Sequence, residues 1–533
     1  MGLSNLGPGR SVVLRAAFLL FVFVQSSNGG NILVFPVDGS HWVNMKILME
    51  ELHGRGHTMT VVRASSSWYI KETSPLYSSI TIEDSMKFDD FFDDYLKRQI
   101  EFLKGQASVL KFFSATWEFF VMLSDAHRLA CKMLERMLDD PDLMKGLQDE
   151  KFDLVLTDPA ISAGVMLAKY LKIPLVLNAR WICSGEGHFA IAPSPLSYVP
   201  VPGSGHSDKM TFSQRVKNAL FYGLILFQDM FVVGPHYKTL CSKYFDAECD
   251  VLAYTQAADI WLMRLDFVFD FPRPTMPNVV YMGGFQCKPS KALPDDLEAF
   301  VQSAGEHGII IMSLGTLVKG LPSDMAHQIA AAFAQLPQKV IWRHLGERPS
   351  TLGNNTMLVQ WMPQNDLLGH PQIKAFVAHG GTNGIQEAIY HGVPVLGVPL
   401  FFDQFDNLLR VRERGGGLIL ELSELNRRTF HESLQEVMHN PSYRANMRRL
   451  SRLHRDQPVA PLDLAVFWVE FVMRNKGATH LRTDSYKLPW YAYHSVDVIL
   501  TLLSAAGLLL FTIFAAIRYV CHRMCYRKKM KHD

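Results

Sequence analysis

Residues 361–404 read WMPQNDLLGHPQIKAFVAHGGTNGIQEAIYHGVPVLGVPLFFDQ, and this stretch decides the fold. Within it, the apolar run 375–378 is followed by His-Gly-Gly and then by a segment with helical spacing that begins near Thr382. A strand, a glycine turn and a helix in this order form part of a β-α-β unit, which favours a parallel sheet. Gly380 and Gly381 would let a phosphate approach the first N–H groups of the helix, where the helix dipole favours an anion.

A second glycine turn, SLGT (313–316), also follows an apolar run and could meet the same phosphates from the other side. Neither turn fits the GxGxxG pattern of dinucleotide-binding enzymes or the P-loop of phosphate-cleaving ATPases, so both classes are disfavoured. A glycine turn before a helix is common in proteins, and taken alone it leaves an ordinary turn as the alternative.

Strand-like runs alternate with helical segments in both halves of the chain. The Pro-rich segment 270–294 interrupts this alternation and is predicted to link two α/β domains, whereas the aromatic-rich segment 83–150 is predicted to be a helical insertion. Two such domains leave a cleft at the carboxyl ends of their strands, where open α/β sheets bind ligands. The strand-like runs are 31–37, 58–64, 153–158 and 174–180 in the first half, and 308–316, 339–344, 357–363, 375–381, 393–399 and 417–422 in the second.

Both ends of the 533-residue chain carry targeting signals. Arg10 and Arg15 precede the short apolar run 16–24, which predicts a signal peptide cleaved between about residues 26 and 30. The uncharged stretch 498–517 is long enough to cross a membrane, and the basic residues after it predict a cytosolic tail. These features predict a single-pass membrane protein whose preceding domains lie in a secretory lumen.

Charge and cysteine content argue against nucleic-acid-binding, disulfide-rich and zinc-binding proteins. The formal net charge of +2 gives no electrostatic footprint for nucleic acid. The five cysteines of the predicted lumenal part are odd in number and match no metal-ligand spacing, so a disulfide scaffold and a zinc site are both disfavoured. The triplet Asp140-Pro141-Asp142 follows a helix in a polar turn and is expected to be solvated surface. Asn354 begins a sequon and is a candidate for N-glycosylation.

The segment 361–404 resembles the donor-binding signature of the UDP-glycosyltransferases in its animal form, and the resemblance extends over the whole mature chain, including the helix 467–472, the membrane anchor and the basic tail. The chain most resembles the membrane-bound UDP-glucuronosyltransferases. The resemblance implies a GT-B fold, in which two Rossmann-like domains face each other across a cleft, plus one C-terminal transmembrane helix.

This resemblance also implies the boundaries of the parts. The helix at 455–480 is expected to pack back on the N-terminal domain. The expected parts are a signal peptide (1–29), an acceptor-binding domain (30–284), a UDP-sugar-binding domain (285–480), a lumenal juxtamembrane segment (481–497), the transmembrane helix (498–517) and a cytosolic tail (518–533).

The resemblance assigns donor-binding roles residue by residue. Trp361 would stack on uracil, with a core tryptophan as the structural alternative, and Asp403 would bind sugar hydroxyls, with a helix cap as its alternative. For Arg264 the family suggests a donor-side contact, but a structural salt bridge is an equal alternative. The remaining implied roles are Gln364 beside the nucleoside, Glu387 on the ribose, Gln404 on the sugar, and Ser313, His379, Asn383 and Gly384 on the diphosphate.

His41 follows the first strand-like run of the mature chain, NILVFPV. Glycosyl transfer needs a base for the acceptor hydroxyl, and histidine titrates near neutral pH. A second residue must orient the ring, and Asp158, which ends the strand-like run 153–158, is the candidate. Asp158-Pro159 is also good chemistry for a helix start, so an N-cap is the alternative. The resemblance places the catalytic histidine and aspartate at His41 and Asp158.

The sequence therefore predicts an inverting transferase of the endoplasmic reticulum that moves glucuronic acid from UDP-glucuronate to a small lipophilic acceptor, without a metal or cofactor. Another UDP-sugar such as UDP-glucose or UDP-N-acetylglucosamine, a non-catalytic single-pass receptor, and a scaffold or folding factor are the alternatives. The resemblance is compatible with homo- or hetero-oligomers. Lys529 and Lys531 near the C-terminus resemble a dilysine retrieval signal, with topology and lipid attraction as the alternative role.

Overall fold

The computed structural model describes residues 29–83, 88–105, 109–180, 187–318 and 320–529. The predicted signal peptide, apart from Gly29, lies outside the described residues. The chain divides into two compact units, 1–481 and 482–533.

The first half of the larger unit forms a seven-stranded sheet in which every neighbouring pair is parallel, with the order β3-β2-β1-β4-β5-β6-β7. Its central strands are buried on both faces, which explains their continuous apolar sequences. The strands are β1 (Asn31–Phe35), β2 (Thr58–Ala64), β3 (Ser78–Ile82), β4 (Leu154–Thr157), β5 (Leu175–Ala179), β6 (Ile260–Met263) and β7 (Val279–Tyr281).

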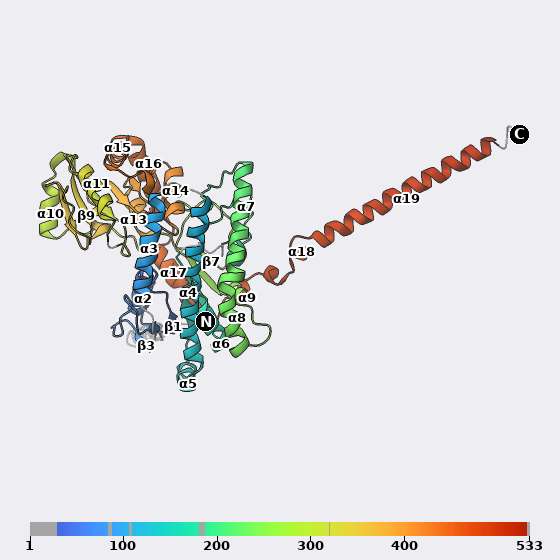
Figure 1. Cartoon of the computed structure of the whole chain (residues 1–533). Helices are drawn as coiled ribbons and strands as arrows, with labels where there is room; N and C mark the ends of the chain where they lie inside the picture. Colours follow the sequence, from blue (N-terminus) through green and yellow to red (C-terminus); the bar gives the residue numbers. More distant parts are fainter. Residues whose placement is uncertain (1–28, 84–87, 106–108, 181–186, 319, 530–533) are drawn as a thin grey trace, which may run out of the picture. The chain divides into compact units, whose positions relative to one another are not determined.

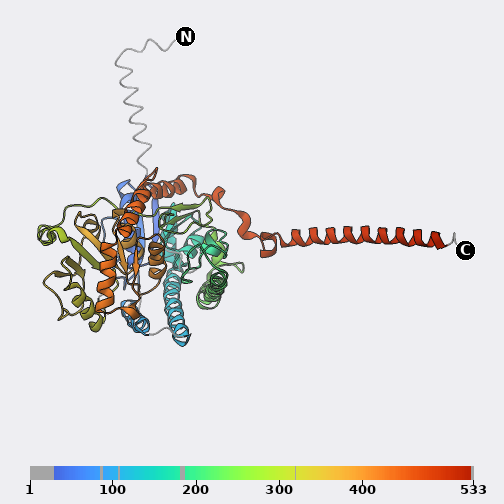
Figure 2. The same ribbon diagram turned by 90° about the horizontal axis from the view of Figure 1, so that it is seen from above.

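The second half forms a six-stranded parallel sheet with the order β10-β9-β8-β11-β12-β13. In Figures 1 and 2 its yellow and orange elements gather in one lobe, and the blue to green elements of the first sheet gather in another. Its strands are β8 (Ile309–Ser313), β9 (Lys339–Arg343), β10 (Thr356–Val359), β11 (Ile373–Ala378), β12 (Val395–Gly397) and β13 (Gly417–Ile419).

Helices connect the strands of both sheets. The segment 83–150, predicted as a helical insertion, directly follows β3 and contains the three helices α3, α4 and α5. The helices of the first half are α2 (Ser40–Gly54), α3 (Phe88–Lys104), α4 (Val109–Leu138), α5 (Pro141–Asp149), α6 (Ala163–Leu171), η1 (Gly187–Ile191), α7 (Phe212–Phe227), η2 (Gln228–Val233), α8 (Gly234–Tyr244) and α9 (Val251–Gln256). Those of the second half are α10 (Asp295–Gln302), η3 (Gly305–His307), α11 (Ser323–Phe333), α12 (Gln364–Leu368), α13 (Thr382–His391), α14 (Gln404–Glu413), η4 (Leu422–Glu424), α15 (Arg427–His439), α16 (Pro441–Arg455), α17 (Pro461–Asn475) and η5 (Thr479–Leu481).

The Pro-rich segment 270–294 is not only a linker. It contains β7, which pairs with β6 as the edge strand of the first sheet. The prolines bracket this strand rather than interrupt it, and an edge strand needs only one hydrogen-bonded neighbour. The strand is three residues long, too short for its alternation to stand out among the prolines.

Helix α17 returns from the end of the larger unit to the first sheet. Its buried side chains join the core cluster that also holds residues of β1, β4 and α2, such as Val34, Leu156 and Leu48. Those buried side chains are Ala465, Val466, Val469, Val472 and Met473. The last helix of this unit is therefore part of the N-terminal domain's core, although it follows the second sheet in the chain.

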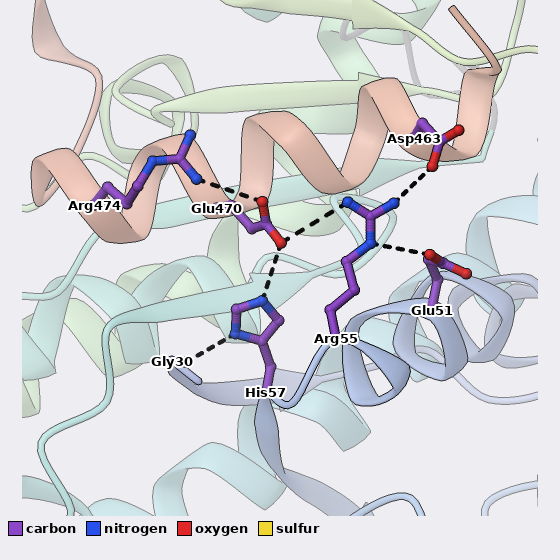
Figure 3. Close-up of polar contacts among 7 residues, drawn as sticks. All are labelled: Gly30, Glu51, Arg55, His57, Asp463, Glu470 and Arg474. Atoms are coloured by element: carbon purple, nitrogen blue, oxygen red, sulfur yellow. Dashed lines mark hydrogen bonds and ion pairs between the residues drawn. The ribbon is translucent and has the colours of Figure 1, made fainter. Parts of the chain in front are cut away.

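A polar network fastens the outer side of α17 to the end of α2 and to His57, which directly precedes β2 (Figure 3). Arg55 donates to Asp463 at 2.6 Å and to Glu51 at 3.0 Å. His57 accepts the backbone N–H of Gly30 on Nδ1 at 2.8 Å, and its Nε2 lies 3.3 Å from Glu470. Most of these charges are partly solvated, so the apolar side of α17 carries more of the attachment than the ion pairs do.

Two described helical stretches are long and apolar enough to cross a membrane, namely Phe212–Tyr244 and Val496–Tyr526. The first was not predicted as a span and comprises α7, η2 and α8, which run beside α4 (Figure 1). Tyr237 fixes it to the domain, because the buried hydroxyl accepts the N–H of Ser162 and lies 2.8 Å from Nδ1 of His127. A disulfide joins Cys241 to Cys249 at the end of α8. We therefore assign this stretch to the N-terminal domain.

The smaller unit consists of η6 (Asp484–Lys487), α18 (Trp490–Tyr493) and α19 (Val496–Lys529). Helix α19 is continuous (Figure 2) and contains the predicted membrane-spanning stretch 498–517. The apolar side chains of its stretch Val496–Tyr526 are exposed, as those of a lipid-facing helix must be.

Candidate active site

One cleft of about 480 Å³ is lined by residues of both sheets. Its walls are the carboxyl ends of the strands, where the sequence pattern places the ligand site. The N-terminal wall includes His41 and Arg180, and the C-terminal wall includes His379, Trp361 and Asp403.

His41 and Asp158 meet at the ends of two adjacent strands. Strands β1 and β4 pair in parallel, with Phe35 opposite Thr157, so both chains leave the sheet at the same level. The structure places His41 in the first turn of α2, after Gly39, whose φ of 72° permits the turn. Nδ1 of His41 lies 2.7 Å from Oδ2 of Asp158, and both side chains are buried. This pair has the geometry of a base and the carboxylate that orients it.

Burial lowers the pKa of His41, because removing the ring from water disfavours its charged form. The charge of Asp158 and its hydrogen bond act in the opposite direction, and the net pKa stays below the ordinary value of 6.5. The ring is therefore neutral at pH 7 and able to accept a proton.

Asp158 does not cap a helix, since α6 begins at Ala163 with Ser162 at its N-cap position. Its Oδ1 instead accepts the backbone N–H of Ala160 at 2.9 Å, which closes a short turn after β4. One oxygen thus shapes the turn, while the other faces His41.

The two glycine turns meet around His379. A Cβ added to Gly315 or to Gly381 would lie 2.6 Å from Nε2 of His379, so a side chain at either position would collide with the ring. Gly380 has a φ of 97° and lies against the backbone of Gln404. Ser313 is paired with Ala378 across β8 and β11. These turns bring Ser313, His379 and the first residues of α13 to one wall of the cleft.

Burial lowers the pKa of His379 to about 4, so its ring is neutral at pH 7. His379 can therefore offer a hydrogen bond to an anion but no positive charge. The N–H groups at the start of α13, which include those of Asn383 and Gly384, supply the partial positive charge of this wall.

Trp361, Gln364 and Glu387 line the same end of the cleft. The side chain of Trp361 is 73% exposed, which rules out the alternative of a core tryptophan. Gln364 begins α12 and donates from Nε2 to Glu387 at 2.6 Å. An exposed indole face beside an amide–carboxylate pair is suited to a flat base and its attached hydroxyl groups.

Asp403 and Gln404 lie at the start of α14, buried but lining the cleft. Asp403 occupies the N-cap position without a capping side-chain bond, and its Oδ2 accepts from Thr382 and Asn407 instead. Gln404 accepts two backbone N–H groups on Oε1. The preceding residue, Phe402, has a φ of 54°, a conformation that costs energy for a side-chain-bearing residue and is common at ligand sites.

Arg264 does not line the cleft, unlike the other residues predicted for the donor site. It is 1% exposed, and its Nη2 donates to the side-chain oxygen of Asn383 at 2.9 Å. No ion pair of Arg264 occurs among the described residues, which argues against the alternative of a structural salt bridge. Arg264 therefore lies behind the cleft surface and holds the cleft-lining residue Asn383 in place.

Sequence reasoning missed two cleft-lining arginines, Arg180 and Arg343. Arg343 ends β9, and its Nη1 donates to the carbonyl of Gly315 at 2.6 Å, which braces the SLGT turn. Arg180 directly follows β5 and donates from Nη1 to Oγ of Ser40. A basic residue at the carboxyl end of a parallel strand is a signal that could have identified both.

The wall of the cleft contributed by α2, α4 and the loops after β2 and β4 includes several apolar side chains. Its lining includes Val43, Trp68, Phe119, Met122 and Ile161, which come from α2, α4 and the loops after β2 and β4. This wall lies within the first half of the chain and can hold a lipophilic molecule next to His41.

No group of three or more histidine, cysteine, aspartate or glutamate side chains suited to a metal ion occurs in the described part of the chain. Asp140 of the Asp140-Pro141-Asp142 triplet is exposed and caps α5 by accepting the N–H groups of Asp142 and Leu143. Asn354 is exposed in the turn before β10, so its side chain is accessible to a glycan.

Glu387 should make the stability of the fold depend on pH. Burial raises the pKa of its carboxyl from 4.5 to about 7, against the opposing hydrogen bond from Gln364. The folded state then holds a proton that the unfolded state has lost, so this contribution to stability decreases as the pH rises from 4.5 through about 7.

We expect Glu387→Gln to raise the free energy of unfolding at pH 8 by about 1–3 kcal/mol, because it removes the buried charge. The gain should vanish near pH 4.5, because the buried Glu387 is then protonated and as neutral as the glutamine that replaces it. Thermal unfolding at the two pH values measures it, with Glu306→Gln at an exposed position as the control. An equal effect of Glu387→Gln at both pH values would contradict the assignment.

Comparison with known proteins gives consistent matches over nearly the whole chain. Residues 30–532 match the family described as "UDP-glucoronosyl and UDP-glucosyl transferase". The chain is 41% identical over 517 residues to UDP-glucuronosyltransferase 1A5 of Rattus norvegicus, covering 97% of this chain and 96% of the relative. It is 42% identical over 518 residues to UDP-glucuronosyltransferase 1A3 of Homo sapiens, with the same coverage of both chains.

Solved structures of glycosyltransferases share the fold. The calicheamicin glycosyltransferase CalG4 matches with a TM-score of 0.56 at 18% identity, covering 84% of this chain and 99% of that one. A UDP-glucosyltransferase from Polygonum tinctorium matches with a TM-score of 0.56 at 14% identity and the same coverage. With the two parallel sheets, these matches confirm the predicted GT-B fold.

Proposed function

The chain belongs to the family of UDP-glucuronosyl and UDP-glucosyl transferases, and from this membership we propose that it transfers glucuronic acid from UDP-glucuronate to a small lipophilic acceptor with inversion at C1. The relatives named as UDP-glucuronosyltransferases support the donor sugar. The observation that carries the chemistry is the pair His41–Asp158, which faces the donor wall across one cleft.

The proposed step is a single displacement. The acceptor oxygen forms a bond to C1 of the sugar, the bond from C1 to the diphosphate oxygen breaks, and UDP leaves with the electron pair. Nδ1–H of His41 is donated to Asp158, so Nε2 is the nitrogen that takes the acceptor's proton. Asp158 holds the ring and stabilises the imidazolium that forms. Attack from the face opposite to UDP converts the α-linked donor into a β-glucuronide.

The donor wall has the groups that a UDP-sugar requires. Trp361 would stack on uracil beside Gln364, and Glu387 would accept ribose hydroxyls. The start of α13, with Ser313 and His379, would hold the diphosphate as negative charge develops on it. Asp403 and Gln404 would bind sugar hydroxyls. We propose that the reaction needs no metal or other cofactor, because these groups already stabilise the leaving diphosphate.

Trp361→Ala should raise the apparent KM for the donor, through a loss of roughly 1–3 kcal/mol of stacking and burial. The acceptor KM should stay close to that of the wild type, because the indole lies on the C-terminal wall. Initial rates with each substrate varied in turn measure both constants. If only the acceptor KM moved, the assignment of the two walls would be reversed.

The proposal is tested with microsomes that express the full chain, supplied with a panel of UDP-sugars and phenolic acceptors. We expect product with UDP-glucuronate and little with UDP-glucose or UDP-N-acetylglucosamine. A strong preference for UDP-glucose or UDP-N-acetylglucosamine would change the proposed donor sugar but leave the proposed reaction unchanged. No product with any donor would favour the alternative of a non-catalytic receptor with this fold.

The site is proposed to lie in the lumen of the endoplasmic reticulum. The apolar helix α19 and the basic residues that follow residue 517 support a single-pass anchor with a short cytosolic tail. Lys529 and Lys531, which resemble a dilysine retrieval signal, would return the protein from later compartments.

Replacing Lys529 and Lys531 together with serine should let part of the protein leave the endoplasmic reticulum. The other basic residues of the tail, Arg518 to Lys528, remain to keep the orientation. A glycan on the exposed Asn354 would then become resistant to endoglycosidase H, and Asn354→Gln is the control for the glycan itself. Resistance of the wild-type glycan would show that the proposed location is wrong.

A further inference from the structure

Arg180 occupies a place in the cleft that the proposed mechanism leaves unused. Four neighbouring strands of the first sheet, β1, β4, β5 and β6, are followed at their carboxyl ends by His41, Asp158, Arg180 and Arg264. Arg180 directly follows Ala179, the last residue of β5, and is only 8% exposed. Its guanidinium donates to Oγ of Ser40, the residue before His41. A largely buried positive charge therefore lies beside the proposed base.

Arg180 lines the same cleft as His41 and His379. Burial is the main cause of the lowered pKa values of His41 and His379, and the charge of Arg180 contributes to both. In the proposed function, His41 acts on the acceptor and His379 holds the diphosphate. The sugar must lie between these two, because its C1 is joined to the diphosphate and is attacked by the acceptor. Arg180 thus lines the space that the sugar would fill.

The other cleft-lining cations serve different parts of the donor. Arg343 gives its Nη1 hydrogen bonds to the carbonyls of Gly315 and Val318, at the turn beside the diphosphate wall. Lys288 acts on Glu387, at the nucleoside end. Among the described residues that line the cleft, Arg180 is the one guanidinium contributed by the N-terminal sheet. It follows a strand of the first sheet, whereas Asp403 and Gln404 lie at the start of α14 in the second half of the chain.

A sugar with a carboxylate at C6 differs from glucose by one negative charge. A guanidinium matches a carboxylate with two parallel hydrogen bonds, and such charge-assisted pairs are strong where water is excluded. We propose that Arg180 binds the C6 carboxylate of the donor sugar and is the residue that makes the enzyme prefer UDP-glucuronate to UDP-glucose. This inference rests on the proposed function and names the group that recognises its donor.

The test measures donor preference in the full-length chain. Arg180→Met should lower kcat/KM for UDP-glucuronate by roughly 10- to 100-fold, as expected for the loss of a hydrogen bond to a charged group. The value for UDP-glucose should stay equal or rise, since no buried charge then opposes a neutral sugar. Arg180→Lys keeps the positive charge but lacks the paired N–H donors of the guanidinium. Its kcat/KM for UDP-glucuronate should lie between those of the wild type and Arg180→Met. The inhibition constant of UDP, which has no sugar, should not change.

Arg343→Met is the matched comparison, since it also removes a cleft guanidinium. It should lower kcat/KM for both donors by the same factor, because its target is the turn beside the diphosphate. If a variant is too slow to assay, thermal shifts with UDP-glucuronate and UDP-glucose report the same preference as binding. An equal loss with both donors in Arg180→Met, or weaker UDP inhibition, would overturn the inference. A wild type that uses UDP-glucose and not UDP-glucuronate would instead overturn the proposed donor.

Discussion

His41→Ala should lower kcat by roughly 10³-fold, since a positioned general base contributes about 10²- to 10⁴-fold to such a reaction. The change removes the group that takes the acceptor's proton. It should leave the affinity for UDP-glucuronate nearly intact, because His41 is assigned to the acceptor, and the groups assigned to the uracil, ribose and diphosphate come from the C-terminal wall. Initial rates at saturating substrate and donor-induced thermal shifts measure the two quantities.

The pH profile provides a control that does not depend on the variant's folding. The pKa of His41 lies below its usual value because of burial, so the wild-type rate should be flat at neutral pH and fall only in acid. Unchanged turnover in His41→Ala would exclude His41 as the base. If His41→Ala lowered the affinity for the donor together with the rate, the loss would indicate a damaged cleft rather than lost base catalysis.

Asp158→Asn should lower kcat by about 10²- to 10⁴-fold, by analogy with other histidine–carboxylate pairs. Asparagine can still accept the N–H of Ala160 and so keep the turn after β4, which makes it a gentle replacement. It cannot stabilise the imidazolium, and it can orient the ring toward the wrong tautomer.

The same variant should move the acid limb of the pH profile. The charge of Asp158 and its hydrogen bond raise the pKa of His41 against burial, so removing that charge lowers this pKa further. The acid limb should therefore shift to lower pH while the plateau falls. A plateau that falls without any shift of the limb would mean that Asp158 acts only through the structure of the turn.

Much of the fold followed from apolar runs and glycine turns. Strands such as β1, β4, β8 and β11 are buried on both faces and read as continuous apolar stretches, which is why their ends could be located. Strand β7 could not be located from the sequence, because its three residues lie among prolines and it is defined by its pairing with β6. Pairing across a sheet depends on residues distant in sequence, which a local pattern does not contain.

The candidate site also contains residues that could be located from the sequence and residues that could not. Residues next to glycine turns or at strand ends, such as His41 and His379, were placed by local sequence together with the family resemblance. Arg264 was expected at the donor and lies behind Asn383 instead, since a strand end fixes where a side chain starts but not how far it reaches. Arg180 was missed for a related reason, because its importance comes from Ser40 and His379, which approach it only in the folded chain.

The central claim is tested most directly by the configuration of the product at C1. Microsomes that express the chain are given UDP-α-glucuronate and a phenolic acceptor, and the purified conjugate is analysed by proton NMR and by digestion with β-glucuronidase. A single displacement driven by His41 predicts only the β-anomer, with a trans-diaxial coupling between H1 and H2 and complete release of the phenol by the enzyme. An α-linked product resistant to β-glucuronidase would contradict the inverting mechanism and the role assigned to His41 and Asp158.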